Sequence, residues 1–144
     1  MFLDGQSSRT RGYRQNGDVP RVIQPDPPPP MSVEIAARVF GSSLRLALLR
    51  HYRGTASSQA DAAAALDLTQ SVVSKNTAVL VDAGVVVPDP PGRWKGTPGK
   101  YIVDEERLRH LMAVTMIYSL NGQPIKGFDK DLREAAETLT KEGW

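Results

Sequence analysis

The sequence predicts a mainly α-helical fold with one small β-hairpin. From residue 32 onward, apolar residues recur at intervals of three and four, which is the spacing of amphipathic helices. The exception is the run VVVPDPPGRWKGTPGKYIV, where β-branched residues flank a loop rich in proline and glycine, as in two short paired strands. These patterns predict five to six helices and a single hairpin in one folded domain of a 144-residue chain.

The charge of the chain permits a nucleic-acid partner without requiring one. Eighteen Lys and Arg residues against 16 Asp and Glu residues give a formal net charge of +2. Residues 69–103 carry four basic and two acidic residues, whereas residues 104–144 carry six and eight. Positive charge is therefore mildly concentrated in the middle of the chain.

Composition also argues against several kinds of site. The chain has no cysteine, which excludes a disulfide framework, a thiolate metal site and a cysteine nucleophile. His51 and His110 have no second ligand three or four residues away, so we expect no metal and no cofactor. No run approaches the roughly 20 apolar residues of a membrane span, and the first residues lack the apolar core of a secretory signal. We therefore expect a cytoplasmic protein with no membrane partner.

Residues 1–31 predict a disordered, proline-rich N-terminal arm. The stretch has few apolar residues and four arginines, so it cannot bury enough surface to offset the entropy lost on ordering. Its PDPPPP run favours an extended polyproline II spacer. The arm is interpreted either as a dispensable tail or as an arginine-bearing segment that touches a DNA backbone or minor groove.

Two helices are predicted next, with a break between them. Ser32 is the expected N-cap of the first, and Gly41-Ser42-Ser43 interrupts the periodicity. The second helix, LRLALLRHY, is expected to end at Gly54. Its apolar stripe consists of Leu44, Leu48 and Tyr52, and its arginines, Arg45 among them, are expected to face elsewhere.

The central segment has the pattern of a helix-turn-helix. Ser57 or Ser58 is expected to cap a short alanine-rich helix whose apolar side is Ala62, Ala65 and Leu66. Asp67-Leu68-Thr69 predicts a tight turn, and Thr69 is expected to cap a helix over 70–84. The buried face of that helix is expected to include Val73, Thr77 and Leu80. A short helix, a three-residue turn and a longer helix with a polar front form a helix-turn-helix. The hairpin over 87–101 then makes the predicted architecture a winged helix-turn-helix.

The end of the chain predicts two further helices. The first begins after Asp104, ends at Asn121-Gly122 and is apolar over more than one face. It packs either wholly on its own core or, as we favour, in a homodimer interface formed by helices 32–53 and 104–120. Residues 123–144 predict a separate C-terminal surface helix, so the winged domain spans 32–122. The apolar side of that surface helix is Phe128, Leu132, Ala135, Ala136 and Leu139.

Three segments resemble ArsR-type winged-helix repressors. VFGSSLRLALLRHY is similar to the entry helices of that family, LTQSVVSKNTAVLVDAGVV to its recognition helix, and GRWKGTPGKYIVD to its wing. The resemblance covers residues 33–120, and MarR-type and other winged-helix regulators share the architecture. It implies a sequence-specific transcriptional regulator that binds double-stranded DNA as a dimeric repressor. Helix 70–84 would then enter the major groove, and the wing would contact the backbone or the minor groove.

The resemblance also implies which residues contact DNA. Lys75 and Asn76 stand where the family usually has Arg and His, and Thr77 replaces a buried Leu, which predicts a less tightly anchored helix. From the helix-turn-helix the implied contacts are Thr69, Gln70, Ser71, Ser74, Lys75 and Asn76, and from the wing they are Arg93 and Lys95.

Two other classes of function remain open on the residues alone. The near-neutral charge and the substituted recognition helix are compatible with a winged helix used as a protein-interaction module without specific DNA binding. An enzyme is disfavoured, because there is no carboxylate pair or Ser/His/Asp set, and GRWKGTPGK does not have the spacing of a phosphate-binding P-loop. Metal sensing is disfavoured because Arg109-His110 lacks partner ligands.

Overall fold

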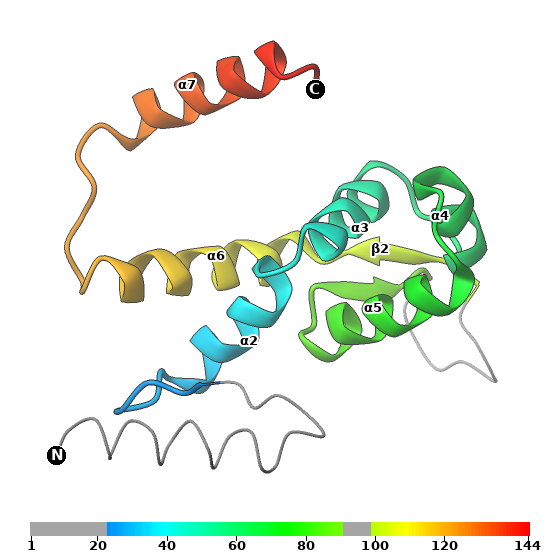
Figure 1. Ribbon diagram of the computed structural model, residues 1–144, viewed down its shortest axis with the longest axis horizontal. Helices are drawn as coiled ribbons and strands as arrows, with labels where there is room; N and C mark the ends of the chain where they lie inside the picture. The colour runs from blue at the N-terminus through cyan, green and yellow to red at the C-terminus, as the bar shows by residue number, and fades with distance from the viewer. Residues whose placement is uncertain (1–22, 91–98) are drawn as a thin grey trace, which may run out of the picture.

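The computed structural model describes residues 23–90 and 99–144, which form six helices and a two-stranded antiparallel hairpin (Figure 1). In chain order the elements are α2 (Met31–Phe40), α3 (Ser43–Gly54), α4 (Gln59–Leu66), α5 (Gln70–Asp82), β1 (Val86–Pro88), β2 (Tyr101–Val103), α6 (Glu105–Ser119) and α7 (Phe128–Lys141). The mainly α-helical winged helix-turn-helix is confirmed. In the described part of the chain, none of the helices has the length and apolar character needed to cross a membrane.

The turn between α4 and α5 is held at both ends by side-chain caps. Ser58 accepts a hydrogen bond from the Asp61 amide at 3.0 Å, and Thr69 accepts one from the Val72 amide at 3.3 Å. Asp67 adopts a left-handed conformation with φ 53°, which lets the Leu68 amide donate to the Ala63 carbonyl at 2.9 Å. The predicted turn is confirmed, with Ser58 as the cap of α4.

Three details of the predicted helices are wrong. Ser32 is not an N-cap, because α2 already begins at Met31, and the carbonyl of the extended Pro30 accepts from the amides of the first turn. Ala65 is exposed, and Ala63 is buried beside Ala62 instead, because α4 lies on α5 through adjacent positions. Helix α5, predicted as the recognition helix over 70–84, ends at Asp82, since Gly84 takes a left-handed conformation with φ 80°.

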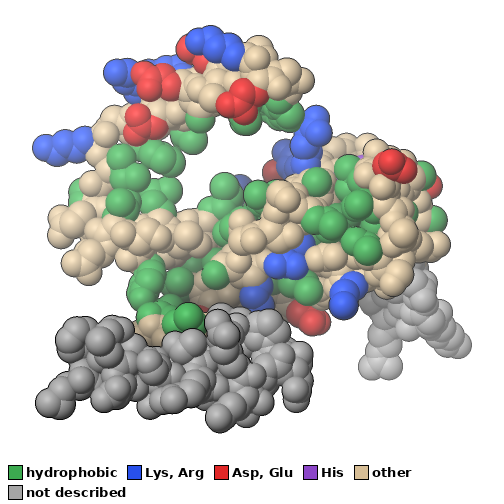
Figure 2. Space-filling view, in the orientation of Figure 1, with side chains coloured by type: hydrophobic (Ala, Val, Ile, Leu, Met, Phe, Trp, Pro, Cys, Tyr) green, Lys and Arg blue, Asp and Glu red, His purple; other side chains and the backbone are tan. Residues whose placement is uncertain are grey.

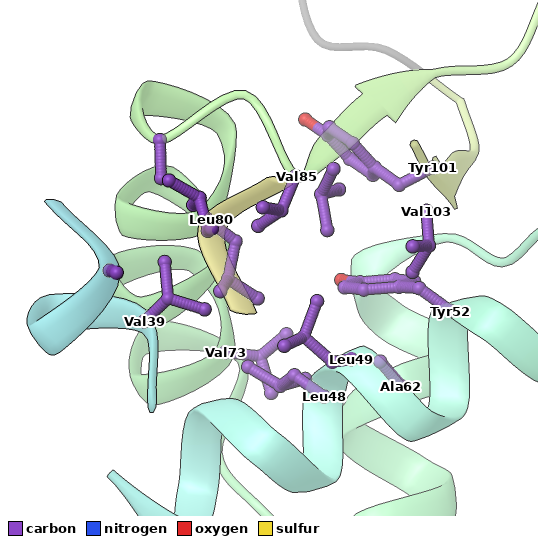
Figure 3. Packing of buried hydrophobic residues seen from close by; sticks show 14 of the residues in the cluster. Val39, Leu48, Leu49, Tyr52, Ala62, Val73, Leu80, Val85, Tyr101 and Val103 are labelled. Carbon is purple, nitrogen blue, oxygen red and sulfur yellow. The ribbon is translucent and has the colours of Figure 1, made fainter. Parts of the chain in front are cut away.

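One apolar cluster joins α2 to α6 and the hairpin (Figure 3). Leu48 and Tyr52 of α3 meet Val73 and Leu80 of α5, and all four side chains are fully buried. Removal of these side chains from water is the main favourable term that holds the helices together. The cluster also contains Val39 of α2, Val85, Val86, Tyr101 and Val103 of the hairpin region, and Leu111 of α6.

Thr77 is buried in this cluster and paired. Its hydroxyl lies 2.9 Å from that of Tyr52, and both residues are almost wholly inaccessible. Burial raises the pKa of the Tyr52 phenol above its usual value, while the hydrogen bond with Thr77 acts in the opposite direction. A buried hydrogen bond therefore takes the place of the apolar contact that a leucine would make, and the looser anchoring of this helix stays a prediction.

The hairpin is attached to the helices through its second strand. Val86 pairs with Val103, Val87 with Ile102, and Pro88 with Tyr101. Tyr101 also exchanges two backbone hydrogen bonds with Ser57, at 2.8 and 3.1 Å, immediately before α4. The wing is therefore anchored to the start of the helix-turn-helix.

We predict that Thr77→Val destabilises the protein by about 1–3 kcal/mol, because it leaves the buried Tyr52 hydroxyl without a partner. The double variant Tyr52→Phe/Thr77→Val removes both polar groups and should recover most of that loss. Urea unfolding of the three proteins measures the free energies. A single variant as stable as the parent would contradict this account of the Tyr52–Thr77 bond.

Candidate nucleic-acid interface

The candidate interface is the face of α5 that points away from the core. Because Val73, Thr77 and Leu80 are buried, the helical period turns the opposite positions toward solvent. The exposed residues on that side are Gln70, Ser71, Ser74, Lys75 and Ala78. Four of the implied DNA contacts in this helix thus share one exposed surface, which also includes the small side chain of Ala78, absent from the sequence-based set.

The N-terminus of α5 adds polarity to the same surface. Thr69 is exposed and uses its hydroxyl oxygen to accept from the Val72 amide, which leaves the hydroxyl hydrogen available to another acceptor. The first amides of a helix have no carbonyl partner within it, and the helix dipole makes this end partially positive. An anionic group such as a phosphate is therefore favoured here.

Asn76 differs from the other implied contacts because its polar atoms are already used within the protein. Its Nδ2 donates to the Val72 carbonyl at 2.9 Å, and its Oδ1 accepts from Nη1 of Arg45 at 3.0 Å. The side chain is half-buried. Its geometry fits a residue that positions Arg45 better than one that reads a base.

Arg45 of α3, which the sequence places away from the apolar stripe of its helix, is not among the implied DNA contacts. Its Nε donates to the Arg38 carbonyl at 2.6 Å, and its Nη1 donates to Asn76, so these two bonds use two of the five guanidinium N–H groups. Figure 2 shows Lys and Arg side chains on neighbouring parts of α2, α3 and α5. The hydrogen bond that places Arg45 beside α5 joins residues 31 positions apart, which helical periodicity cannot reveal.

Of the predicted wing, the structure describes the two strands and the ends of the loop that connects them. Arg93 and Lys95, the two implied wing contacts, lie outside the described residues, as does Trp94. The strands that carry them are in place, with the Asp89 amide donating to the Lys100 carbonyl at 3.0 Å. Lys100 is exposed at the point where the chain returns.

The histidines occupy different settings. His51 Nε2 lies 2.7 Å from the Ser57 hydroxyl, so it takes part in the attachment of the wing. His110 is exposed on α6. Across residues 23–90 and 99–144, no group of three or more His, Cys, Asp or Glu residues is arranged to hold a metal ion.

No protein-family model and no curated protein sequence matches the chain. Among solved structures it is similar to a possible transcriptional regulator for arsenical resistance, with 23% identity, coverage of 72% of this chain and 94% of that one, and a TM-score of 0.48. It is also similar to the homodimeric winged helix-turn-helix DNA-binding domain Mb0332 from Mycobacterium bovis, a possible ArsR-family transcriptional regulator, with 20% identity, coverage of 61% and 79%, and a TM-score of 0.46. A third, RV1404 from Mycobacterium tuberculosis, has 18% identity, coverage of 78% and 82%, and a TM-score of 0.38.

We predict that Thr69→Ala lowers the free energy of unfolding by about 1 kcal/mol, because α5 loses its N-cap. Thr69→Ser keeps the accepting oxygen and should retain most of the stability. The midpoint of urea unfolding distinguishes the two variants. If both unfold at the same denaturant concentration, the cap bond does not stabilise this helix.

Proposed function

We propose that the protein is a sequence-specific regulator of transcription that binds double-stranded DNA and acts as a dimeric repressor. The observation that carries the proposal is the exposed face of α5, whose small polar side chains and Lys75 stand opposite a buried face. The capped turn before α5 and the wing attached beside it support the same conclusion. This is the arrangement by which a recognition helix is held for insertion into a major groove.

The residues on this face suit base edges. Ser71 and Ser74 are short, so they allow the helix to approach the bases closely, and Gln70 can donate to and accept from an adenine edge. Lys75 supplies a point charge that suits guanine O6 or N7, without the two-pronged geometry of arginine. Ala78 adds a methyl group that can contact the methyl of thymine.

The surrounding basic groups suit the backbone. Arg45 is oriented by Asn76 beside α5, where its remaining N–H groups can bind phosphate oxygens. Arg93 and Lys95 are proposed to contact the backbone or the minor groove from the wing. These contacts would fix the register of the protein on DNA, while α5 reads the sequence.

A homodimer through α2, α3 and α6 completes the proposal. Met112, Ile117 and Tyr118 of α6 are each about half exposed, at 53%, 57% and 47%, which is a costly surface for a lone small domain. A two-fold axis near α6 would present two copies of α5 to half-sites roughly 34–36 Å apart. A dimer bound over a promoter would exclude polymerase, so repression is the simplest outcome.

We predict that Lys75→Ala, alone or with Arg93→Ala, weakens binding to the preferred DNA site severalfold or more. Lys130→Ala is the matched control, because it removes the same charge from the distant helix α7. If roughly five phosphates are neutralised, the slope of log affinity against log salt should be about −4 to −5. Affinity is measured by mobility shift on a site selected from a random library, at several salt concentrations.

Two outcomes contradict the proposal. One is an unchanged affinity of the Lys75→Ala/Arg93→Ala protein at fixed salt. The other is a parent protein that fails to bind DNA even at low salt, a result that would favour the protein-interaction module.

We predict a different signature for Arg45. Because the Arg45 side chain is proposed to contact phosphate and no base, Arg45→Ala should weaken binding to specific and to non-specific DNA to a similar extent. It should also reduce the slope of log affinity against log salt by about 1. Asn76→Ala should produce a smaller loss of the same kind, since the arginine remains but is no longer positioned. Arg133→Ala serves as the control, and a loss confined to the specific site would contradict the phosphate role.

A further inference from the structure

Helix α7 is the least supported element of the described chain. None of its 14 residues is buried. Residues 121–127, which connect it to α6, are all exposed, and their left-handed positions at Asn121, Gly122 and Gly127 carry the chain away from the domain (Figure 1). Isolated helices of this length are marginal in water. A helix of this kind needs a packing partner.

The sequence of α7 indicates what kind of partner it needs. Phe128, Leu132 and Leu139 recur at i, i+4 and i+11, with Ala135 at i+7, and together they form one apolar stripe. The opposite side is charged and includes the Lys130–Glu134 pair at 3.5 Å. This spacing of anchors is that of a helix that lies in an apolar groove.

The described residues of the same chain leave an apolar groove open between α2 and α6. It has a volume of about 380 Å³ and is lined mainly by Pro30, Val33, Ala113, Val114, Ile117 and Tyr118. Ile117 is 57% exposed and Tyr118 47%. His110 and Ser32 are the polar groups at its border.

Within one chain the helix and the groove do not meet. α2 packs extensively on α6, whereas α7 has no comparable packing with any described element. Figure 2 shows an open gap between α7 and α6, with hydrophobic side chains on the side of α7 that faces it. The far end of α7 is turned toward α3, where Arg50 lies 5.7 Å from the Trp144 ring.

We propose that α7 of each copy lies in the α2–α6 groove of the other copy, so that two helices are exchanged across the dimer. This inference rests on the proposed dimeric regulator and specifies how its two chains are joined. The helix and the groove complement each other, but one chain does not bring them together. A two-fold axis between two copies would place each helix in the groove of the other copy. Each copy then donates one helix and receives one.

The area of the contact is consistent with a stabilising role. A 14-residue helix is about 21 Å long and about 10 Å wide, so that its footprint is about 200 Å². Each copy would cover its own helix face and its own groove, about 400 Å² of footprint, half of the roughly 800 Å² that each partner buries in a standard interface. The rest of the exposed surface of α2 and α6 supplies the remainder.

Because the chain has no cysteine, the exchange can be tested by crosslinking of single-cysteine variants in the full-length protein. Ile117→Cys, in the groove, and Leu132→Cys, on the α7 stripe, are made in separately tagged chains, mixed under conditions that allow subunit exchange, and treated with a short bis-maleimide. We expect a product that carries both tags, at a yield at least severalfold above that of the control pair. The control replaces Leu132→Cys with Glu137→Cys, which lies on the charged side of α7.

Two results would overturn the exchange. One is a two-tag yield no greater than that of the control pair. The other is an Ile117→Cys/Leu132→Cys double variant that closes within a single chain at high dilution, because α7 would then occupy its own groove. Circular dichroism of each variant verifies that the helices are retained.

A second measurement does not depend on crosslinking. Leu132→Asp/Leu139→Asp should shift the protein toward monomer in sedimentation velocity, at a concentration where Glu134→Gln/Glu137→Gln remains dimeric. An unchanged sedimentation coefficient would contradict the exchange. DNA binding of the unsubstituted chain is scored separately, so that loss of the proposed function and loss of the exchange are recognised as different failures.

Discussion

The packing of the inner side of α5 against α3 is the constraint on which the rest of the molecule depends. Leu48 and Tyr52 of α3 meet Val73 and Leu80 of α5 in a dry contact, and the Tyr52–Thr77 hydrogen bond lies within it. A helix has one orientation once such a face is buried. The outward direction of Lys75 is therefore a consequence of the core. The packing of the core fixes the position of the candidate interface.

The same support extends to the hairpin. Ser57 joins the end of α3 to the wing, because its hydroxyl meets His51 while its backbone pairs with Tyr101. The Tyr101 ring in turn lies 5.9 Å from the ring of Tyr52, and its hydroxyl accepts from Gln59 of α4. Because α5 and the hairpin share one scaffold, their relative placement is constant, as the proposed contact of both with one DNA duplex requires.

The C-terminal part of the chain has the opposite character. α6 buries Leu111 and leaves several large apolar side chains in water, and α7 buries nothing. Folding of a small domain leaves only a small net free energy after the loss of conformational entropy. Large apolar side chains that stay in water therefore forgo a substantial part of the possible stability. The described residues therefore present two different surfaces: the α5 face is polar and is the proposed DNA interface, whereas the exposed apolar faces of α2, α6 and α7 form the proposed contact with a second copy of the chain.

The order of the elements, the caps at Ser58 and Thr69 and the inward side of α5 were predictable, because each depends on residues within one or two helical turns. The roles of Thr77, Asn76 and Arg45 were not. Each depends on a partner that is at least 25 residues away, which periodicity cannot supply. By itself the sequence determined the local elements and the chemistry of their faces. Only the tertiary structure decided which polar groups are consumed inside the protein and which remain free, because those hydrogen bonds form between segments that packing brings together.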